Sequence, residues 1–262
     1  MLKARDHLDF AIATAQEAGR LTLGYFQNDL TPELKEDESP VTVADREAEQ
    51  RIRERIEANY PRHAVLGEEF GASDDQGATH RWLIDPIDGT RAFLRGVPLY
   101  AVLLALEVEG RIEVGVVHFP ALRETVWAAR GMGCYWDGRR CFVRSTASLA
   151  ESVVAFTGAS AFARHGREQA WQRMQAETSY QAGWSDAYGH ALVATGRLEL
   201  MLDPVMNPWD CGPFPVLLEE AGGYFGTWSG ERTVYGGEAL STTSLLLPQV
   251  LERLAGVDDD PR

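Results

Sequence analysis

Apolar side chains recur with helical spacing in two stretches near the start of the chain. Residues 8–26 present an apolar face every three or four positions, and residues 45–60 do the same beside a polar face rich in Glu and Arg. We therefore predict two amphipathic helices, separated by a polar stretch, 28–39, that Pro40 follows. The apolar face of the first helix is formed by Leu8, Ile12, Ala15 and Leu23.

The pattern becomes strand-like between residues 63 and 129. Apolar runs rich in β-branched residues are separated by Gly110 and by the pair Pro120-Ala121, which are typical turn positions. The three longer runs follow one another directly, which favours an antiparallel meander. The predicted strands are 63–66, 81–84 (ending at Asp85-Pro86), 100–108, 112–119 and 124–129.

Strands and helices alternate in the last part of the chain. A run of small and polar residues, 144–152, precedes this change and predicts a boundary between an N-terminal α+β half, 1–147, and a C-terminal α/β half, 148–262. We expect the acidic tail, 258–262, to be frayed. The predicted elements are strands 153–156 and 198–202 and helices 164–177, 186–195 (with Gly196 after its end) and 208–221 (ended by Gly222-Gly223).

Charge and composition narrow the class of protein. The net charge is −14, and such a surface repels nucleic acid and anionic membranes, so we expect neither as a partner. No apolar run approaches the roughly 20 residues of a spanning helix. The N-terminus lacks the apolar core of a signal peptide, and three cysteines at irregular positions make no disulfide framework. We therefore expect a cytoplasmic protein.

The most informative segment is 82–90, in which an apolar strand leads to two aspartates. Asp85 ends the strand, Pro86 begins a turn, and Asp88 follows three positions after Asp85, so both carboxylates can point at one place. Carboxylates this close repel each other, and a divalent cation removes that conflict. The carbonyl of Ile87 is a plausible further ligand. Oxygen ligands alone favour Mg²⁺, Mn²⁺ or Ca²⁺ over Zn²⁺.

Gly89 and Thr90 then begin a predicted short helix that extends to Arg95. Free N–H groups at a helix start favour an anion, and glycine lets the backbone approach a phosphate closely. The hydroxyl of Thr90 can orient a water. One turn thus supplies metal ligands, a phosphate cradle and a proton acceptor.

Structural explanations for the same acids remain open at this point. Asp88 can be the N-cap of the following helix, Glu68 can lie in a surface turn, and Asp210 can be an acid in the first turn of a helix. Each explanation is reasonable alone. Three acids that all lie at the ends of predicted elements favour a shared metal site.

Four segments together resemble the inositol monophosphatase superfamily. They occur in the order of that family and extend from about Lys35 to Gly223, which is most of the chain. The segments are Ser39-Pro40-Val41-Thr42-x-Ala44-Asp45, Gly67-Glu68-Glu69, Asp85-Pro86-Ile87-Asp88-Gly89-Thr90, and Asn207-Pro208-Trp209-Asp210 continued by Glu219-Glu220-Ala221-Gly222-Gly223.

The resemblance implies a fold and a set of roles. The implied fold is a layered αβαβα sandwich, of α+β or α/β class, with the site between its two halves. Glu68, Asp85, Asp88, Asp210 and the carbonyl of Ile87 then hold two or three Mg²⁺ ions, for which Mn²⁺ can substitute. Thr90 with Asp45, beside Glu68, positions the attacking water. Gly89 and Thr90 bind the phosphate, Asp186 and Asp203 face the alcohol part of the substrate, and Arg91 is a further substrate-binding residue.

The segment after Thr90 bears on the substrate, which we expect to be a small phosphate monoester. Inositol monophosphatases usually carry Thr-Asn-Phe, whereas this chain has Thr90-Arg91-Ala92-Phe93 and then Arg-Gly and Pro. This more closely resembles the histidinol-phosphate phosphatases of the superfamily, and Asp186 and Asp203 suit a cationic alcohol. An inositol-1-phosphatase, another small-phosphate phosphatase, or a non-catalytic metal-binding regulator remain alternatives. We also expect a homodimer and inhibition by lithium.

Several other signals indicate no separate chemistry. Cys134 and Arg140 have the spacing of cysteine-dependent phosphatases, but residues 136–139 are typical of a hairpin turn rather than of a strand-to-helix loop. Asp85 and Asp88 are one residue too far apart for the haloacid dehalogenase pattern. The six histidines have no paired metal spacing, and His190 is expected to be a packed or surface residue of a helix.

Overall fold

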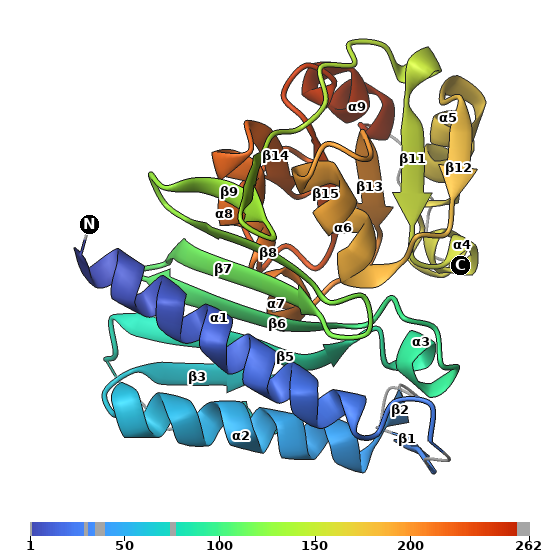
Figure 1. The fold of residues 1–262 in the computed structure, drawn as a ribbon. Coiled ribbons are helices and arrows are strands. Elements are labelled where there is room, and N and C mark those ends of the chain that lie inside the picture. The colour runs from blue at the N-terminus through green and yellow to red at the C-terminus, as the bar shows by residue number, and fades with distance from the viewer. Residues whose placement is uncertain (1, 29–30, 35–39, 74–76, 256–262) are drawn as a thin grey trace.

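The computed structural model describes residues 2–28, 31–34, 40–73 and 77–255, which form five stacked layers of helices and sheets (Figure 1). From one side to the other these are a helix pair, a large sheet, a middle layer of helices, a smaller sheet and an outer helix group. The predicted αβαβα sandwich is confirmed. Most of the polar stretch 28–39, with Ser39 of the first motif, and the tail 258–262 lie outside the described residues.

The large sheet has eight strands in the order β10-β9-β8-β7-β6-β5-β3-β4. Neighbouring strands are antiparallel except β3 and β5, and β6 to β8 form the predicted meander. Its strands are β3 (Ala64–Gly67), β4 (Gly71–Ala72), β5 (His80–Asp88), β6 (Ala101–Val108), β7 (Arg111–Phe119), β8 (Glu124–Ala129), β9 (Gly133–Trp136) and β10 (Arg139–Cys141).

Helices α1 (Leu2–Leu23) and α2 (Val43–Asn59) cover the outer face of this sheet (Figure 1). Thr42 caps α2, because its hydroxyl accepts the Ala44 N–H while the Asp45 carboxylate accepts the Thr42 N–H. The helix pair and the sheet enclose one apolar cluster, to which Leu8, Ile52 and Trp82 belong. A short pair of strands, β1 (Glu33–Leu34) and β2 (Pro40–Val41), lies beside them.

The middle layer consists of α6 (Asp186–Ala194), α7 (Pro208–Cys211) and α8 (Phe214–Glu220). Alternate residues of β5 and β6 point toward it, so Leu83 and Leu103 pack with Phe214, whereas Trp82 belongs to the outer cluster. Both faces of the central strands are therefore buried. Polar side chains can approach this layer only where the strands end.

The smaller sheet has the order β12-β11-β13-β15-β14. Strands β11, β12 and β13 are parallel, and β15 is antiparallel to both of its neighbours. Helices α4 (Ala159–Arg164), α5 (Glu168–Glu177) and α9 (Leu247–Leu254) cover its outer face (Figure 1). The strands are β11 (Val153–Phe156), β12 (Tyr180–Ala182), β13 (Leu200–Asp203), β14 (Gly223–Gly226) and β15 (Ala239–Thr243), preceded by the 3₁₀ turn η1 (Leu149–Glu151).

Strand β5 differs from the prediction that it ends at Asp85-Pro86. The strand continues to Asp88, but its pairing with β6 shifts between Asp85 and Asp88. Pro86 has no N–H to donate to the ladder, so the pairing is interrupted there and resumes where Asp88 lies opposite Ala101. The resulting bulge, rather than a strand-ending turn, sets the directions of the two aspartates.

Two predicted helices are each divided in two. The range 164–177 contains the end of α4 and all of α5, because Gly166 adopts a φ of 66° between them. The range 208–221 contains α7 and α8, with Gly212 and Pro213 at the junction. A Cβ on Gly212 would lie 3.1 Å from the side chains of Leu83 and Ala105, so the junction packs directly on the large sheet.

Some elements carried too weak a pattern to be predicted, namely β12, β14, β15 and α9. The hairpin turn at 136–139 is confirmed by β9 and β10.

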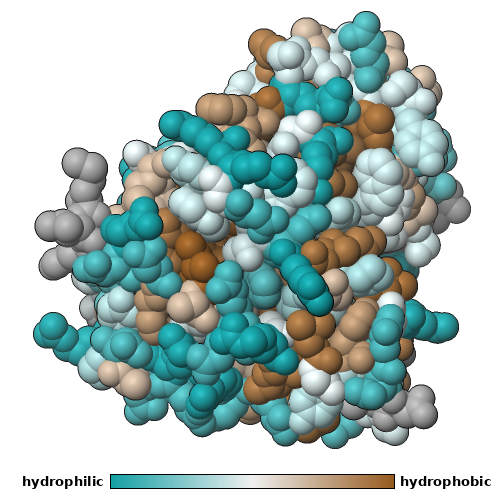
Figure 2. Space-filling view, viewed as in Figure 1, coloured by the Kyte–Doolittle hydropathy of each residue, from teal (hydrophilic) through white to brown (hydrophobic). Residues whose placement is uncertain are grey.

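Within the described residues, no helix is both long and apolar enough to cross a membrane. On the face shown in Figure 2, hydrophobic residues reach the surface in several groups between hydrophilic ones. The division at residue 147 stays a prediction.

Candidate active site

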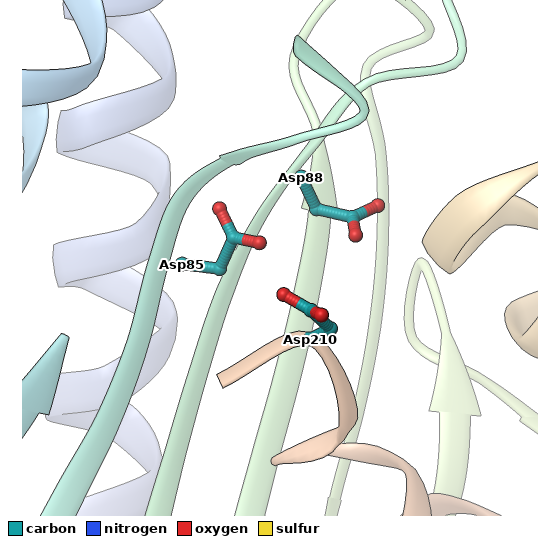
Figure 3. A group of neighbouring side chains, drawn as sticks. All are labelled: Asp85, Asp88 and Asp210. Atoms are coloured by element: carbon teal, nitrogen blue, oxygen red, sulfur yellow. The ribbon is translucent and has the colours of Figure 1, made fainter. Parts of the chain in front are cut away.

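Three aspartates from two distant parts of the chain lie around one point (Figure 3). Asp85 and Asp88 come from the bulged end of β5, and Asp210 comes from α7. One carboxylate oxygen from each lies within 4.8 Å of the other two. The predicted meeting of these acids is therefore observed, and the strand end and the helix start each contribute a side of the site.

Backbone N–H groups fix the direction of each carboxylate. Asp85 accepts the N–H of Ile87 at 3.0 Å, and Asp210 accepts the N–H of Asn207 at 2.8 Å. Asp88 accepts the N–H of Ala187 at 2.7 Å, a bond that joins the large sheet to α6. Each of these bonds uses one oxygen, so lone pairs remain on every carboxylate for a further ligand.

The burial of these acids makes their charge costly. Asp85 is 2 % exposed and Asp88 is 6 % exposed. Burial raises the pKa of Asp85 well above its usual range, and the neighbouring Glu68, Asp88 and Asp210 carboxylates raise it further. Burial, with Asp186 and Asp210, likewise raises the pKa of Asp88. Burial also raises the pKa of Asp210, to about 6.

This donor set fits a hard divalent cation. The group contains only oxygen donors, and the charged neighbours that raise the pKa of Asp85 are themselves carboxylates. A cation among them would remove both the repulsion and much of the cost of burial. Glu68, directly after β3, lines the same cavity and influences Asp85 through its charge and a hydrogen bond.

The hydroxyl of Thr90 lies beside this cluster and has two possible acceptors. The carbonyl of Ile87 is 3.1 Å from Oγ1, and Oδ1 of Asp45 is 3.4 Å away. Asp45 is fully buried behind Thr90, where its other oxygen accepts the N–H and the hydroxyl of Thr42. Whichever acceptor Thr90 uses, Oγ1 keeps lone pairs that can accept a hydrogen bond from a water in the cavity.

Gly89 makes the sharp change of direction that brings Thr90 to this position. Its φ is 80°, in the left-handed region, where a side chain would be strained. A Cβ there would also lie 3.2 Å from Oδ2 of Asp186. Glycine at this position therefore allows the start of α3 (Thr90–Leu94) to approach Asp186 of α6 closely.

One cavity of about 700 Å³ joins these groups to the C-terminal half. Every predicted site residue except Asp45 lines it. The cavity extends from the carboxylates of Asp85, Asp88 and Asp210 to the loop after β11 and the start of α6. Arg91 is exposed and lies beside Asp186. The predicted residues that line it are Glu68, Asp85, Ile87, Asp88, Gly89, Thr90, Arg91, Asp186, Asp203 and Asp210.

Asp186 and Asp203 form a second acidic group in the cavity. Burial raises the pKa of Asp186 to about 6, and Asp203 adds to the effect. Asp203 is 2 % exposed and is already held on both oxygens, because Oδ1 accepts the Thr157 N–H at 3.1 Å and Oδ2 lies 3.2 Å from Nε2 of His190. The Asp186 carboxylate, at the start of α6, is the more accessible of the two.

The sequence analysis gave no role in the site to three residues that shape this part of the cavity. Thr157 contacts both acidic segments, the Ala187 N–H reaches Asp88, and His190 joins Asp203 to Ser241. The sequence predicts a packed or a surface residue of a helix at His190, and it is fully buried. A threonine in a loop and a backbone amide belong to no motif, so no local signal could have identified them.

Comparison with known proteins agrees with the fold and the site. A sequence model described as the inositol monophosphatase family matches residues 3–256. The histidinol-phosphatase of Chlorobaculum parvum is 42 % identical over 89 % of this chain and 90 % of its own. The histidinol-phosphatase of Mycobacterium tuberculosis is 37 % identical over 96 % of this chain and 98 % of its own. The inositol-1-monophosphatase of Mesorhizobium japonicum is 35 % identical over 85 % and 86 %.

Solved structures with the same fold include two bacterial proteins. The extragenic suppressor protein suhB of Bartonella henselae superposes with a TM-score of 0.89 at 27 % identity, and covers 96 % of this chain and 99 % of its own. An IMPase of Thermotoga maritima superposes with a TM-score of 0.85 at 29 % identity, over 96 % and 98 %. The architecture is therefore shared over nearly the whole length of each chain.

The raised pKa values predict how the stability of the metal-free protein depends on pH. A carboxyl whose pKa is higher in the folded than in the unfolded state stabilises the fold fully only below its unfolded pKa, near 3.8. We expect the free energy of unfolding in EDTA to fall as pH rises from about 4 through 6, where Asp186 and Asp210 titrate, and the raised pKa values of Asp85 and Asp88 add to this loss of stability with rising pH.

Asp85→Asn removes one of these charges and keeps an oxygen for the Ile87 N–H. We expect it to stabilise the metal-free protein at pH 7 by on the order of 1 kcal/mol or more, and to reduce the gain in free energy of unfolding that Mg²⁺ produces. Chemical denaturation in EDTA and in Mg²⁺ measures both effects. Asp9→Asn, in an exposed pair with Arg5, is the matched control and should change neither. A destabilised metal-free Asp85→Asn would contradict the account of mutual repulsion.

Proposed function

Because this chain belongs to the inositol monophosphatase family, we propose that it is a Mg²⁺-dependent phosphatase whose substrate is histidinol phosphate. The family match and the histidinol-phosphatase relatives together indicate that the chain is a phosphatase. One observation carries the finer proposal: a single cavity joins a cation-binding group of carboxylates to a second acidic group, Asp186 and Asp203.

Glu68, Asp85, Asp88 and Asp210, with the carbonyl of Ile87, are the residues that would hold two or three Mg²⁺ ions. When bound, such ions polarise a phosphoryl group and lower the pKa of a bound water. The support is the all-oxygen donor set and the close approach of the three aspartates. The directions of the three aspartate carboxylates are set in advance by backbone N–H groups, so these three require little rearrangement.

Thr90 and Asp45 would orient the attacking water. The Thr90 hydroxyl donates to Asp45 or to Ile87 and accepts a hydrogen bond from the water, which directs the water's remaining lone pair toward the phosphorus. The buried Asp45 is held by Thr42 and cannot turn away. The N–H groups of Gly89 and Thr90, at the start of α3, would bind the phosphate oxygens.

Asp186 and Asp203 would recognise the alcohol part of the substrate. Histidinol carries an ammonium group and an imidazole, and a carboxylate in a partly desolvated site forms charge-assisted hydrogen bonds with such groups. Arg91, exposed at the cavity beside Asp186, would contact the phosphate side. The names of the first two relatives support this substrate, because both are histidinol-phosphatases.

Inositol 1-phosphate is the second candidate substrate. The Mesorhizobium japonicum relative is named an inositol-1-monophosphatase, and hydroxyl groups can also donate to the same carboxylates. Use of Mn²⁺ in place of Mg²⁺, inhibition by lithium, a homodimer and a cytoplasmic location stay predictions.

Removal of the Thr90 hydroxyl should abolish most phosphate release. We expect wild-type protein to release phosphate from histidinol phosphate only with a divalent cation, and Thr90→Val to lower kcat by roughly 10²- to 10⁴-fold. Thr90→Ser, which keeps a hydroxyl, should retain much of the activity. Thr195→Val is the matched control, because that hydroxyl does not line the cavity: it donates to helix carbonyls and accepts from Nε of Arg197. Near-native kcat in Thr90→Val would contradict the assigned role.

The acidic pair should favour the cationic substrate. We expect kcat/KM to be roughly tenfold to a hundredfold higher for histidinol phosphate than for inositol 1-phosphate, since each charge-assisted bond contributes about 1.5–3 kcal/mol. Asp186→Asn and Asp203→Asn should lower kcat/KM for histidinol phosphate much more than for inositol 1-phosphate. An equal or higher value for wild-type protein with inositol 1-phosphate would assign the enzyme to that substrate instead.

A further inference from the structure

Two of the three cysteines lie opposite each other at the edge of the large sheet, on strands that do not line the acidic cavity. Cys134 of β9 pairs directly with Cys141 of β10, and β10 is an outermost strand of the sheet. Both are free thiols, and no residue of β9 or β10 lines the acidic cavity. This pair takes no part in the proposed phosphatase function.

The hairpin fixes the register that brings the two cysteines together. Asp137 and Gly138 have φ values of 48° and 77°, as a two-residue turn of the I′ type requires. The pair Trp136 and Arg139 closes the turn, and the ladder then continues to Cys134 and Cys141. A slip in register would need a different turn, so the cysteines stay opposite each other.

Disulfide formation here requires only a movement of sulfur atoms. The two Sγ atoms are 3.4 Å apart, and one thiol donates to the other sulfur. Residues directly opposite in an antiparallel ladder have Cα atoms about 4.5–5.5 Å apart. Disulfides span Cα separations of about 4.4–6.8 Å, so the backbone can stay in place.

We propose that Cys134 and Cys141 are a redox-active dithiol that small disulfides, such as oxidised glutathione, convert to an intramolecular disulfide. The Cys141 thiolate attacks one sulfur of the small disulfide, which forms a mixed disulfide and releases one small thiolate. Cys134 then loses its proton and attacks Sγ of Cys141, which releases the second small thiolate. The protein loses two electrons and two protons, and the small disulfide becomes two thiols.

The surroundings assign the first attack to Cys141. It is 8 % exposed, whereas Cys134 is fully buried. The hydrogen bond between the two sulfur atoms and the charge of Arg197 lower the pKa of Cys141, while the same hydrogen bond and burial raise the pKa of Cys134. Cys211 offers an internal comparison, since it is buried in α7 and its pKa is raised.

Oxidised glutathione and peptide mapping test this proposal on the full-length protein. After reduction and removal of the reductant, we expect treatment to lower the protein mass by about 2 Da and to leave one cysteine, Cys211, open to alkylation after unfolding. Trypsin cleaves after Arg139 and Arg140, between the two cysteines, so a disulfide-linked peptide pair is diagnostic.

Single serine variants separate the steps. Cys211→Ser should form the same disulfide. Cys134→Ser should stop at a glutathione adduct on Cys141, a gain of about 305 Da, and Cys141→Ser should stay unmodified. Three alkylatable cysteines in treated wild-type protein, a stable glutathione adduct on it, or a linkage to Cys211 would overturn the proposal.

A second and independent feature is Thr157, which holds both parts of the acidic pair. It lies in the loop between β11 and α4 and lines the cavity. Its N–H donates to Oδ1 of Asp203 at 3.1 Å, and its Oγ1 accepts the N–H of Asp186 at 2.9 Å. One residue therefore fixes the positions of two acids that come from different elements.

The bond to Asp186 is made where the backbone is strained. Asp186 has a φ of 55°, in the left-handed region that non-glycine residues adopt only at a cost in energy. This conformation turns the next N–H, that of Ala187, onto Asp88 at 2.7 Å. The Thr157 hydroxyl satisfies the N–H of Asp186 and so helps to hold this conformation.

We infer that Thr157 is a positioning residue for substrate selectivity, an inference that rests on the proposed function. Its hydroxyl holds Asp186 at the start of α6, where the Asp186 carboxylate faces the alcohol part of the substrate. Without that acceptor, Asp186 can relax toward ordinary helical geometry and move its carboxylate. The Asp203 bond comes from the Thr157 backbone and would survive a change of side chain.

Thr157→Val and Thr157→Ser form a matched pair that tests this role. Thr157→Val keeps the shape of the side chain but loses the acceptor, and we expect about a tenfold lower kcat/KM for histidinol phosphate, mainly through KM, with a smaller change for inositol 1-phosphate. Thr157→Ser should behave like the wild type. Hydrogen exchange of the segment 185–188 should rise in Thr157→Val only.

The outcomes separate this inference from the proposed function. If wild-type protein does not hydrolyse histidinol phosphate, the proposed function fails, and the exchange measurement alone decides whether Thr157 holds Asp186. Equal losses with both substrates would indicate a merely structural role and overturn the inference. So would unchanged exchange in Thr157→Val, or Thr157→Ser behaving like Thr157→Val.

Discussion

Buried carboxylates that repel one another are the constraint on which the functional part of this structure depends. Asp85 and Asp88 are almost completely removed from solvent, and Asp210 and Glu68 add to the negative potential around them. Such an arrangement lowers the stability of the fold unless a cation compensates it. The rest of the molecule holds the acids in place, with backbone N–H bonds to the carboxylates and apolar packing on both faces of β5.

The bulge in β5 allows a strand that is otherwise buried on both faces to present two carboxylates to the site. Upstream of it, Trp82 and Leu83 face opposite apolar layers, so no polar side chain could lie there without a partner. Pro86 interrupts the ladder, and the shift in pairing lets Asp85 and Asp88 point into the same cavity. Gly89 then turns the chain toward α3. The chemistry is therefore located where regular pairing ends.

The C-terminal half completes the site through a few contacts. The Ala187 N–H bonds to Asp88, Asp210 joins the aspartates of β5, and Thr157 connects Asp186 with Asp203. The strained backbone at Asp186 allows the first of these contacts. The geometry of the cation-binding acids and of the second acidic group is thus coupled through the start of α6. The Cys134–Cys141 pair, in contrast, depends only on one hairpin.

The sequence by itself determined the features that depend on neighbouring residues. Helical spacing marked α1 and α2, alternation marked the meander, and the order of four motifs identified the fold and the acids. The sequence could not determine the continuation of β5 past Pro86 or the division of 208–221 into α7 and α8, because ladder pairing and the packing of Gly212 on Leu83 decide these. Nor could it identify Thr157 or the Ala187 N–H. Their roles depend on distances between segments far apart in the chain, and only the tertiary structure sets those distances.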